Sequence, residues 1–119
     1  MEALAEEYSR YGEKFKKAVK LVEEKSVKLH HFHPSGREIW TVVGVEGDQL
    51  VDDSQPYCSC RHFHYKVLSG KDETCYHLLG VKMARRLNAY DTIDLDDTEY
   101  PILLKLLIKD ISQSLRRKE

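Results

Sequence analysis

The chain has 119 residues, with 19 Lys and Arg against 20 Asp and Glu and a formal net charge of -1. This length suits one domain with a modest core, and the near-neutral charge argues against strong, indiscriminate attraction of the whole molecule to nucleic acid. The sequence has no run of 18 apolar residues, and its N-terminal residues are charged and helical in character rather than signal-like. We therefore expect a soluble, intracellular protein that does not enter a membrane.

The N-terminal region carries a helical repeat of apolar residues. They recur at alternating steps of four and three, with Glu and Lys between them: Leu4, Tyr8, Tyr11, Phe15, Ala18 and Val22. This spacing predicts an amphipathic helix over about residues 2–24. A coiled coil would show the same spacing, but the pattern is short, so we favour packing of this helix onto the body of the domain.

The next region is typical of strands joined by tight turns. Residues 27–32 lead into the turn sequence at 33–36, and residues 39–45 are rich in strand formers. A second turn at Gly47-Asp48 leads into residues 49–52, which completes a three-stranded meander that delivers Cys58 at its far end. No thiol lies near His30, His31 and His33 in the sequence, so we expect these imidazoles to face solvent.

Four residues in two close pairs have the types that bind zinc. Cys58 and Cys60 form one pair, and Cys75 and His77 form the other. Zinc prefers a tetrahedral shell of sulfur and nitrogen, and four protein ligands leave no position for water or substrate, so one structural Zn²⁺ and no catalytic residue are predicted. Three cysteines cannot all pair, and a chain that looks intracellular argues against a disulfide framework.

The spacing within each pair restricts its backbone. Residues two apart on a helix diverge by roughly 200°, so Cys75 must precede the helix that His77 opens. Along a strand they lie about 6.6 Å apart, so the chain must curl at Cys58 to Cys60. His62 and His64 are rival ligands, but a position on the surface or outside the ligand shell is favoured for both.

The helix after His77 carries a basic face. Lys82, Arg85 and Arg86 follow each other at steps of three and four, and Arg61 and Lys66 are expected to lie nearby across the zinc site. Such a group could bind nucleic acid. The alternative is an ordinary solvated helix face, which is common on proteins of this kind.

The C-terminal region begins with five carboxylates in residues 91–99 and continues as an apolar helix, with Asp97 or Thr98 as its expected cap. Leu104, Leu107, Ile111 and Leu115 form one stripe, and further apolar residues widen it. The helix is therefore either deeply buried or in contact with a partner, and the candidate interface is Ile102, Leu103, Leu106 and Leu107.

The elements together predict an α+β fold in three segments: a helix at 1–25, a zinc-binding domain at 26–90, and an acidic connector with the apolar helix at 91–119.

The arrangement CxC, fourteen residues, then CxH at a helix start resembles the SWIM zinc finger, a ββα-type module. The resemblance extends over roughly residues 25–110 to the small stand-alone SWIM proteins of homologous recombination, of the Shu-complex SWIM-subunit type. The residues that carry it are Ser26-Val27, Pro34-Ser35-Gly36-Arg37, Tyr57 to Cys60, Phe63, Val67-Leu68 and Cys75 to Leu79. Tyr76 differs from the basic residue often found between the last two ligands.

That resemblance implies an accessory role in homologous recombination and DNA repair. Such proteins pair with a RecA-family recombinase paralogue, an ATPase, and assist the recombinase on single-stranded DNA, in the cytoplasm of an archaeon or the nucleus of a eukaryote. The alternative is a zinc finger that binds DNA directly without an ATPase partner. An enzyme is not expected, because the sequence has no HExxH, no phosphate-binding glycine loop and no nucleophile elbow.

Overall fold

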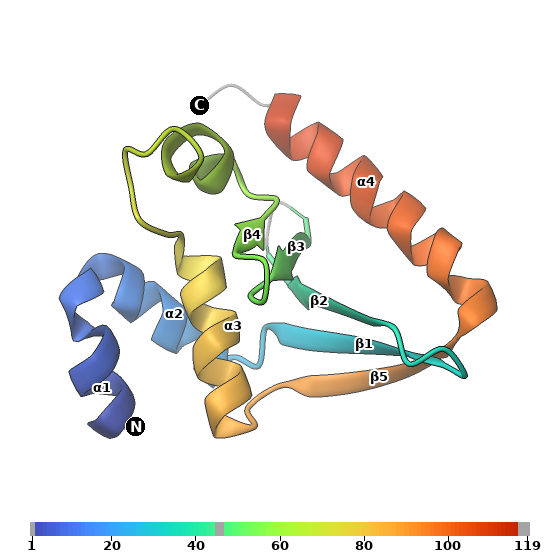
Figure 1. Ribbon diagram of the computed structural model, residues 1–119, viewed down its shortest axis with the longest axis horizontal. Helices are drawn as coiled ribbons and strands as arrows, with labels where there is room; N and C mark the ends of the chain where they lie inside the picture. Colours follow the sequence, from blue (N-terminus) through green and yellow to red (C-terminus); the bar gives the residue numbers. More distant parts are fainter. Residues whose placement is uncertain (1, 45–46, 117–119) are drawn as a thin grey trace.

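A mixed five-stranded sheet with helices on both faces forms the body of the protein (Figure 1). The computed structural model describes residues 2–44 and 47–116. Its elements are α1 (Glu2–Tyr8), η1 (Ser9–Tyr11), α2 (Glu13–Glu23), β1 (Val27–His33), β2 (Glu38–Val42), β3 (Gln49–Asp52), β4 (Tyr57–Cys58), η2 (Phe63–Val67), α3 (Tyr76–Leu87), β5 (Asp91–Asp96), η3 (Asp97–Glu99) and α4 (Tyr100–Arg116). The predicted α+β class is confirmed. The remaining residues of the three expected segments, 1, 45–46 and 117–119, lie outside this description.

The N-terminal helical region is interrupted at Gly12, so the prediction of one continuous helix over 2–24 was wrong. Gly12 has φ 60° and ψ -120°, a conformation that glycine adopts far more readily than other residues, and it separates α1 and η1 from α2. Tyr8, Tyr11 and Phe15 still pack against one apolar cluster. The apolar repeat therefore continues across the break and serves two short helices.

The strand order is β4-β3-β2-β1-β5, and the first three strands in the chain form the predicted antiparallel meander. Val27 lies opposite Val42, and Trp40 lies opposite Val51. Strand β4 then pairs with β3 so that Cys58 lies opposite Val51. The prediction that the meander delivers Cys58 is thereby confirmed.

Strand β5 occupies the edge of the sheet beyond β1, where we expected part of an acidic connector. It runs parallel to β1, from Lys28 opposite Asp91 to His33 opposite Asp96. The connector prediction was wrong for residues 91–96 because the carboxylates mask a weak period of two, in which Ile93 and Leu95 share one face. Leu95 packs against the cluster beneath α4. No helix among the described residues is long and apolar enough to cross a membrane.

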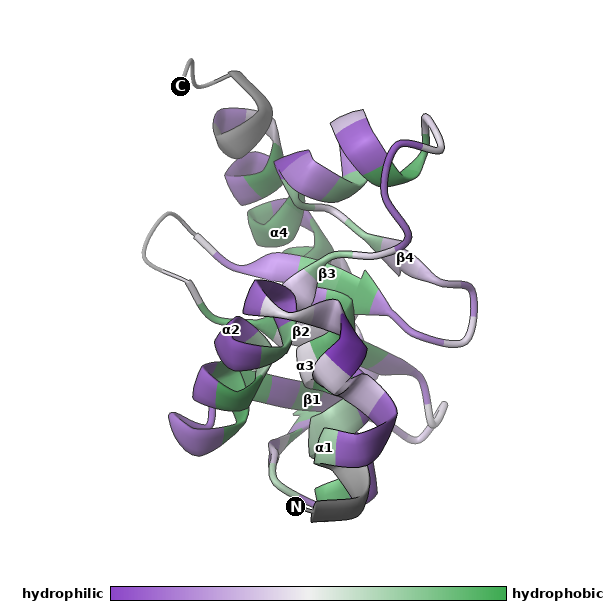
Figure 2. Ribbon diagram, turned by 90° about the vertical axis from the view of Figure 1, so that its left-hand side faces the viewer, coloured by the Kyte–Doolittle hydropathy of each residue, from purple (hydrophilic) through white to green (hydrophobic). Residues whose placement is uncertain are grey.

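The sheet separates two apolar clusters. On one face α2 and α3 cover Val27, Val42 and Val51, and on the other α4 covers Phe32 and Ile39. Alternate residues of a strand point to opposite faces, which explains how one strand supplies both clusters. Figure 2 shows hydrophobic strands at the centre and hydrophilic outer turns on α2.

One 3-10 turn, η3, lies between the capping residue Asp96 and the first residue of α4, Tyr100. The capping residue is Asp96, whose carboxylate accepts from the backbone N–H of Thr98 at 2.9 Å, while Glu99 accepts from the N–H of Asp96 at 2.9 Å. The expected caps, Asp97 and Thr98, lie one and two residues too far along, inside η3. A short 3-10 turn therefore separates this capping box from the α-helix. The side chains of Leu4 and Leu115 lie outside the described part of the structure.

Candidate metal centre

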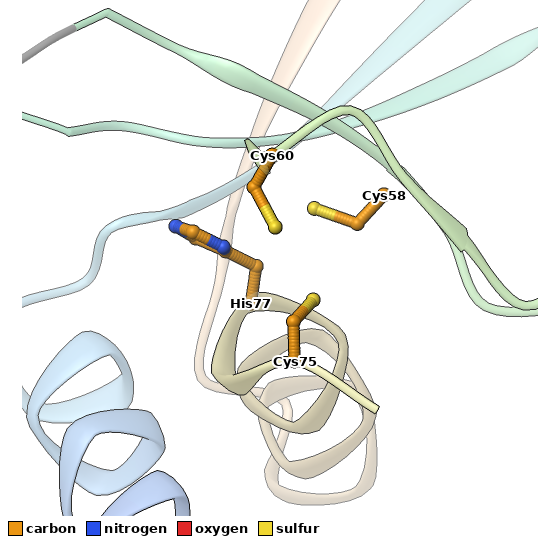
Figure 3. A group of neighbouring side chains, drawn as sticks. All are labelled: Cys58, Cys60, Cys75 and His77. Carbon is orange, nitrogen blue, oxygen red and sulfur yellow. The ribbon is translucent and has the colours of Figure 1, made fainter. Parts of the chain in front are cut away.

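The four predicted ligands meet where β4 and α3 approach each other. Cys58 ends β4, Cys60 follows it, Cys75 directly precedes α3, and His77 is the second residue of that helix. The three sulfur atoms and one imidazole nitrogen all lie within 4.8 Å of one another. Figure 3 shows the four side chains converging from the two segments. All three cysteines are buried and His77 is partly buried.

Cys75 and His77 have the backbone conformation predicted from their spacing. Cys75 is extended, with φ -113° and ψ 163°, and α3 begins at Tyr76. The expectation that Cys75 precedes the helix is confirmed. The ring of Tyr76 stacks on the imidazole of His77 with centroids 4.1 Å apart, which restricts the orientation of that ring.

Ser59, between the first two cysteines, holds their turn against the sheet. Its backbone N–H donates to the carbonyl of Leu50 at 2.9 Å, and its hydroxyl accepts from the Leu50 N–H at 2.9 Å and donates to Gln49 at 2.7 Å. With Ser59 bound to β3, the thiols on either side are free to face the helix. Sequence reasoning missed this role, because a serine between two ligands is equally compatible with an exposed turn.

Hydrogen bonds among the three thiols shift their pKa values in opposite directions. Hydrogen bonds from the thiols of Cys58 and Cys75 lower the pKa of Cys60, and the backbone N–H of Phe63 also donates to its sulfur at 3.4 Å. The hydrogen bond with Cys60 raises the pKa of Cys58. The hydrogen bond with Cys58 lowers the pKa of Cys75, but Cys60 and burial outweigh this and raise it to about 12. Three thiolates at such short range would repel one another, and a bound cation would offset that repulsion.

The imidazole points to the same conclusion. Nδ1 of His77 is buried and has no hydrogen-bond partner among the described residues, an arrangement that costs about 1–3 kcal/mol when nothing compensates it. Bonding of this nitrogen to a metal would remove that cost. Three sulfurs and one nitrogen match the donors that zinc selects, so the buried Cys3His group is consistent with one zinc site.

The surroundings exclude water from one side of the group and leave the rival histidines outside it. Phe63 is buried, and its ring meets that of Tyr57 edge to face at 5.5 Å. His62 is exposed and its Nε2 bonds to Asp72 at 2.7 Å, while the exposed His64 packs against the ring of Tyr65. Neither imidazole is in the Cys3His group.

The candidate nucleic-acid residues fall into two groups. On α3, Arg85 pairs with Asp53 at 2.5 Å and Arg86 pairs with Glu7, so carboxylates neutralise two of the three cations of that face. The third, Lys82, is partly buried. Arg61 and Lys66 instead lie around η2, beside the exposed ring of Tyr65. Sequence reasoning missed Tyr65, which the spacing of basic residues could not identify.

The four candidate interface residues lie on two different sides of α4. Ile102 and Leu106 are 60% and 59% exposed on the outer side of α4. Leu107 is buried in the cluster with Phe32 and Ile39, and Leu103 packs against that cluster. The inner pair therefore holds the helix on the sheet, and only the outer pair is available for a partner.

Comparison with known proteins gave two relatives. Zinc finger SWIM domain-containing protein 7 of Mus musculus is 32% identical over 102 residues, which are 84% of this chain and 64% of that protein. The protein of the same name in Homo sapiens is 29% identical over 96 residues, which are 79% of this chain and 68% of that protein. The chain thus spans just under two thirds of the mouse protein. No protein-family model matches it, and no solved structure does.

Proposed function

Because the chain is homologous to Zinc finger SWIM domain-containing protein 7 over most of its length, we propose that it is a zinc-stabilised accessory protein of homologous recombination and DNA repair. In this proposal it pairs with a RecA-family recombinase paralogue and assists the recombinase on single-stranded DNA. The observation that carries it is the buried Cys3His group at the positions where the sequence resembles a SWIM zinc finger.

The proposed metal has a structural task. Zinc held by Cys58, Cys60, Cys75 and His77 would supply a closed tetrahedral shell with no open position for chemistry. The residues themselves come from β4 and the start of α3, so their joint ligation ties the sheet to that helix. Helix α3 in turn packs closely on α2, where Gly80 lies against Leu21. The metal-binding group therefore fixes the orientation of the whole helical layer.

The proposed partner surface is the outer side of α4. Ile102 and Leu106 are one helical turn apart on this side of α4, and each is about 60% exposed. Large aliphatic side chains in a row on a helix are the anchors that a partner groove accepts. Because Leu103 and Leu107 hold the helix from below, the outer row can engage a partner without detaching α4 from the sheet.

The partner proposal is tested by changing the outer row alone. The double variant Ile102→Lys and Leu106→Lys should keep its stability within about 0.5 kcal/mol, because both side chains are exposed. We expect an ATPase to co-purify with the wild-type protein from the native host and to be lost from the double variant. Lys105→Ala, an exposed change on the same helix, is the control and should retain the partner. A folded double variant that still recovers the ATPase contradicts the interface, as does a double variant that unfolds.

Direct binding of single-stranded DNA is the second candidate function, and η2 carries the observation that favours it. Tyr65 is 49% exposed, the guanidinium carbon of Arg61 lies 5.7 Å from its ring, and Lys66 adjoins both. An exposed ring beside cations can stack on a base while the cations contact phosphate. On α3, the ion pairs of Arg85 with Asp53 and of Arg86 with Glu7 would have to break before either arginine contacted phosphate.

Titration of the free protein with single-stranded DNA at two salt concentrations tests this candidate. Tyr65→Ala should weaken binding at both, whereas Lys66→Ala should also reduce the salt dependence, because one phosphate contact is lost. Arg85→Ala on α3 serves as the control and should change little. Absence of salt-dependent affinity in the wild-type protein would exclude direct binding and leave the adaptor role unaffected.

A further inference from the structure

Two histidines and an aspartate meet on the sheet away from the Cys3His group. His31 and His33 lie two residues apart on β1 and so share a face, and β5 places Asp94 directly beside His31. Asp94 Oδ1 lies 2.9 Å from His33 Nε2 and 3.8 Å from His31 Nδ1, and the imidazole centroids are 4.3 Å apart. One donor atom of each residue lies within 4.8 Å of the others.

This group is accessible from solvent and has a further carboxylate beside it. His31 is partly buried, whereas His33 and Asp94 are exposed. Glu38 lies opposite His31 in the antiparallel pair of β1 and β2, and cross-strand partners of this kind place their side chains on one face. Figure 1 shows β1 and β5 running side by side toward the start of α4. The neighbouring Phe32 points to the opposite face, beneath α4.

We propose that His31, His33 and Asp94 bind a divalent transition-metal ion, with Zn²⁺ as the reference ion and Glu38 as an additional carboxylate ligand. Imidazole nitrogens suit zinc, nickel, copper and cobalt, whereas magnesium and calcium select oxygen-only shells. The two imidazoles thus set the class of ion. Three or four ligands at an exposed position leave room for water, so this site differs from the closed Cys3His group in affinity and in exchange.

A simple ion pair is the competing explanation for this geometry. A protonated His33 bonded to Asp94 at 2.9 Å would suffice for such a pair, and exposed pairs of that kind are common. The ion pair does not require His31, whose ring lies edge to face with that of His33 and turns a nitrogen toward the same carboxylate oxygen. A metal site needs three donor atoms grouped around one point, and these three all lie within 4.8 Å of one another, whereas an ion pair needs only two.

Metal binding at this position would join β1 to β5, two paired strands that are far apart in the sequence. Its ligands come from β1 and β5, which pair across 63 residues of sequence, from Lys28 to Asp91. A bound ion would therefore hold β5 on the sheet, and with it the start of α4. Such an ion would bind whether or not the protein acts in recombination.

Zinc titration of protein that already holds one equivalent of zinc tests the proposal. We expect wild-type protein to bind a second equivalent in isothermal titration calorimetry. His31→Gln, His33→Gln and Asp94→Asn should each weaken that second step at least about tenfold, since losing a ligand costs more than losing a group that orients one. His64→Gln, which changes an exposed imidazole outside the group, should bind as the wild type does. Far-UV circular dichroism confirms that each variant is folded, and Asp94→Asn keeps the shape of the side chain.

A second measurement locates the ion. Addition of Ni²⁺ to ¹⁵N-labelled, zinc-loaded protein should broaden amide signals of β1 and β5 first, because paramagnetic broadening falls steeply with distance. Failure of the wild-type protein to bind a second equivalent overturns the proposal. So does a second equivalent that the three variants bind as tightly as the wild type, or one that His64→Gln loses to the same extent.

Discussion

The two faces of the sheet differ in how completely they are filled. Among the described residues, the apolar cluster beneath α2 and α3 has 14 buried members, the three cysteines included, whereas the cluster beneath α4 has three: Phe32, Ile39 and Leu107. The first face has a continuous core joined by the Cys3His group. The second is closed by one helix whose outer side stays apolar. The two faces therefore differ in what holds their helices: the first combines a large apolar core with the Cys3His group, and the second relies on a small apolar cluster.

The largest effect is expected when the Cys3His group is broken. Cys75→Ser should abolish zinc binding and unfold at least the segment from Tyr57 to Leu87, because zinc binding in small peptides contributes about 10–16 kcal/mol, comparable to the whole stability of a domain. Elemental analysis and thermal unfolding monitor the two effects. Ser69→Ala in the exposed loop removes only solvent-exposed hydrogen bonds to the carbonyls of Tyr65 and Lys66, so it should leave zinc binding unchanged and lower stability only slightly. A Cys75→Ser protein that keeps both zinc and stability would disprove the structural metal site.

Opening the α4 face should cost less and leave the metal in place. Phe32 is fully buried, and its ring meets that of Tyr100 edge to face at 5.0 Å. Phe32→Ala should lower the free energy of unfolding by about 3–5 kcal/mol, measured with urea, while zinc content stays at one equivalent. Leu68→Ala, at an exposed leucine, is the control. Zinc loss in folded Phe32→Ala protein would show that the two faces are not independent.

The contact between α2 and α3 tests the metal-bearing face without touching a ligand. A Cβ atom at Gly80 would lie 2.9 Å from Cδ1 of Leu21. Gly80→Val should therefore lower the free energy of unfolding by about 1–3 kcal/mol through overpacking. Gly80→Ala is the graded control: its methyl comes too close only to Cδ1, the flexible end of Leu21, and the gain in helix propensity of about 1 kcal/mol offsets that contact. Equal stability of the valine variant and the wild type would contradict this close approach.

The smallest effect is expected at Asp72, which joins the loop before α3 to α2. Lys14 Nζ lies 2.5 Å from its carboxylate, and this hydrogen bond, with that of His62, lowers the pKa of Asp72 from 3.8 to about 2. A lowered pKa gives stability that is complete above pH 3.8 and is lost as the pH falls toward 2. Asp72→Asn should therefore cost about 1 kcal/mol at pH 8 and no less at pH 6, because the carboxylate stays ionised and protonation of His62 would strengthen their pair.

The neighbouring acid provides the matched control for that change. Glu73 pairs with Arg10 at 3.2 Å, but both side chains are more than 60% exposed, so Glu73→Gln should have almost no effect on urea unfolding. A difference between Asp72→Asn and wild type that disappears between pH 8 and pH 6 would mean that the Asp72 carboxylate titrates near neutral pH, contrary to its lowered pKa.

The sequence identified the ligand group because the constraint is local. Residue types at a spacing of two restrict the backbone at once, and this placed Cys75 ahead of the helix that His77 enters. The meander was predictable for a similar reason, since its turns and alternating strands are short-range features. The two pairs are separated by 14 residues, and nothing in the intervening sequence indicates that they meet. We inferred their meeting from the four ligands that a zinc ion requires.

The features that were missed depend on contacts far along the chain. Strand β5 is stabilised by pairing with β1, so its own sequence, rich in aspartate, carried little strand signal. The same long-range pairing brings Asp94 to His31, a proximity that no local spacing encodes. The inner and outer sides of α4 were likewise indistinguishable until Phe32 and Ile39 defined which leucines face the sheet.

The acidic composition of β5 also has a consequence for self-association. An edge strand exposes backbone N–H and C=O groups that could template a strand of another molecule. If a second copy added its own β5 at this edge, Asp91, Asp94 and Asp96 would face identical charges, which disfavours the pairing. At the opposite edge β4 has only two residues, too few to hold a foreign strand. The carboxylates of β5 and the short length of β4 thus both disfavour edge-to-edge pairing of the sheet with other copies.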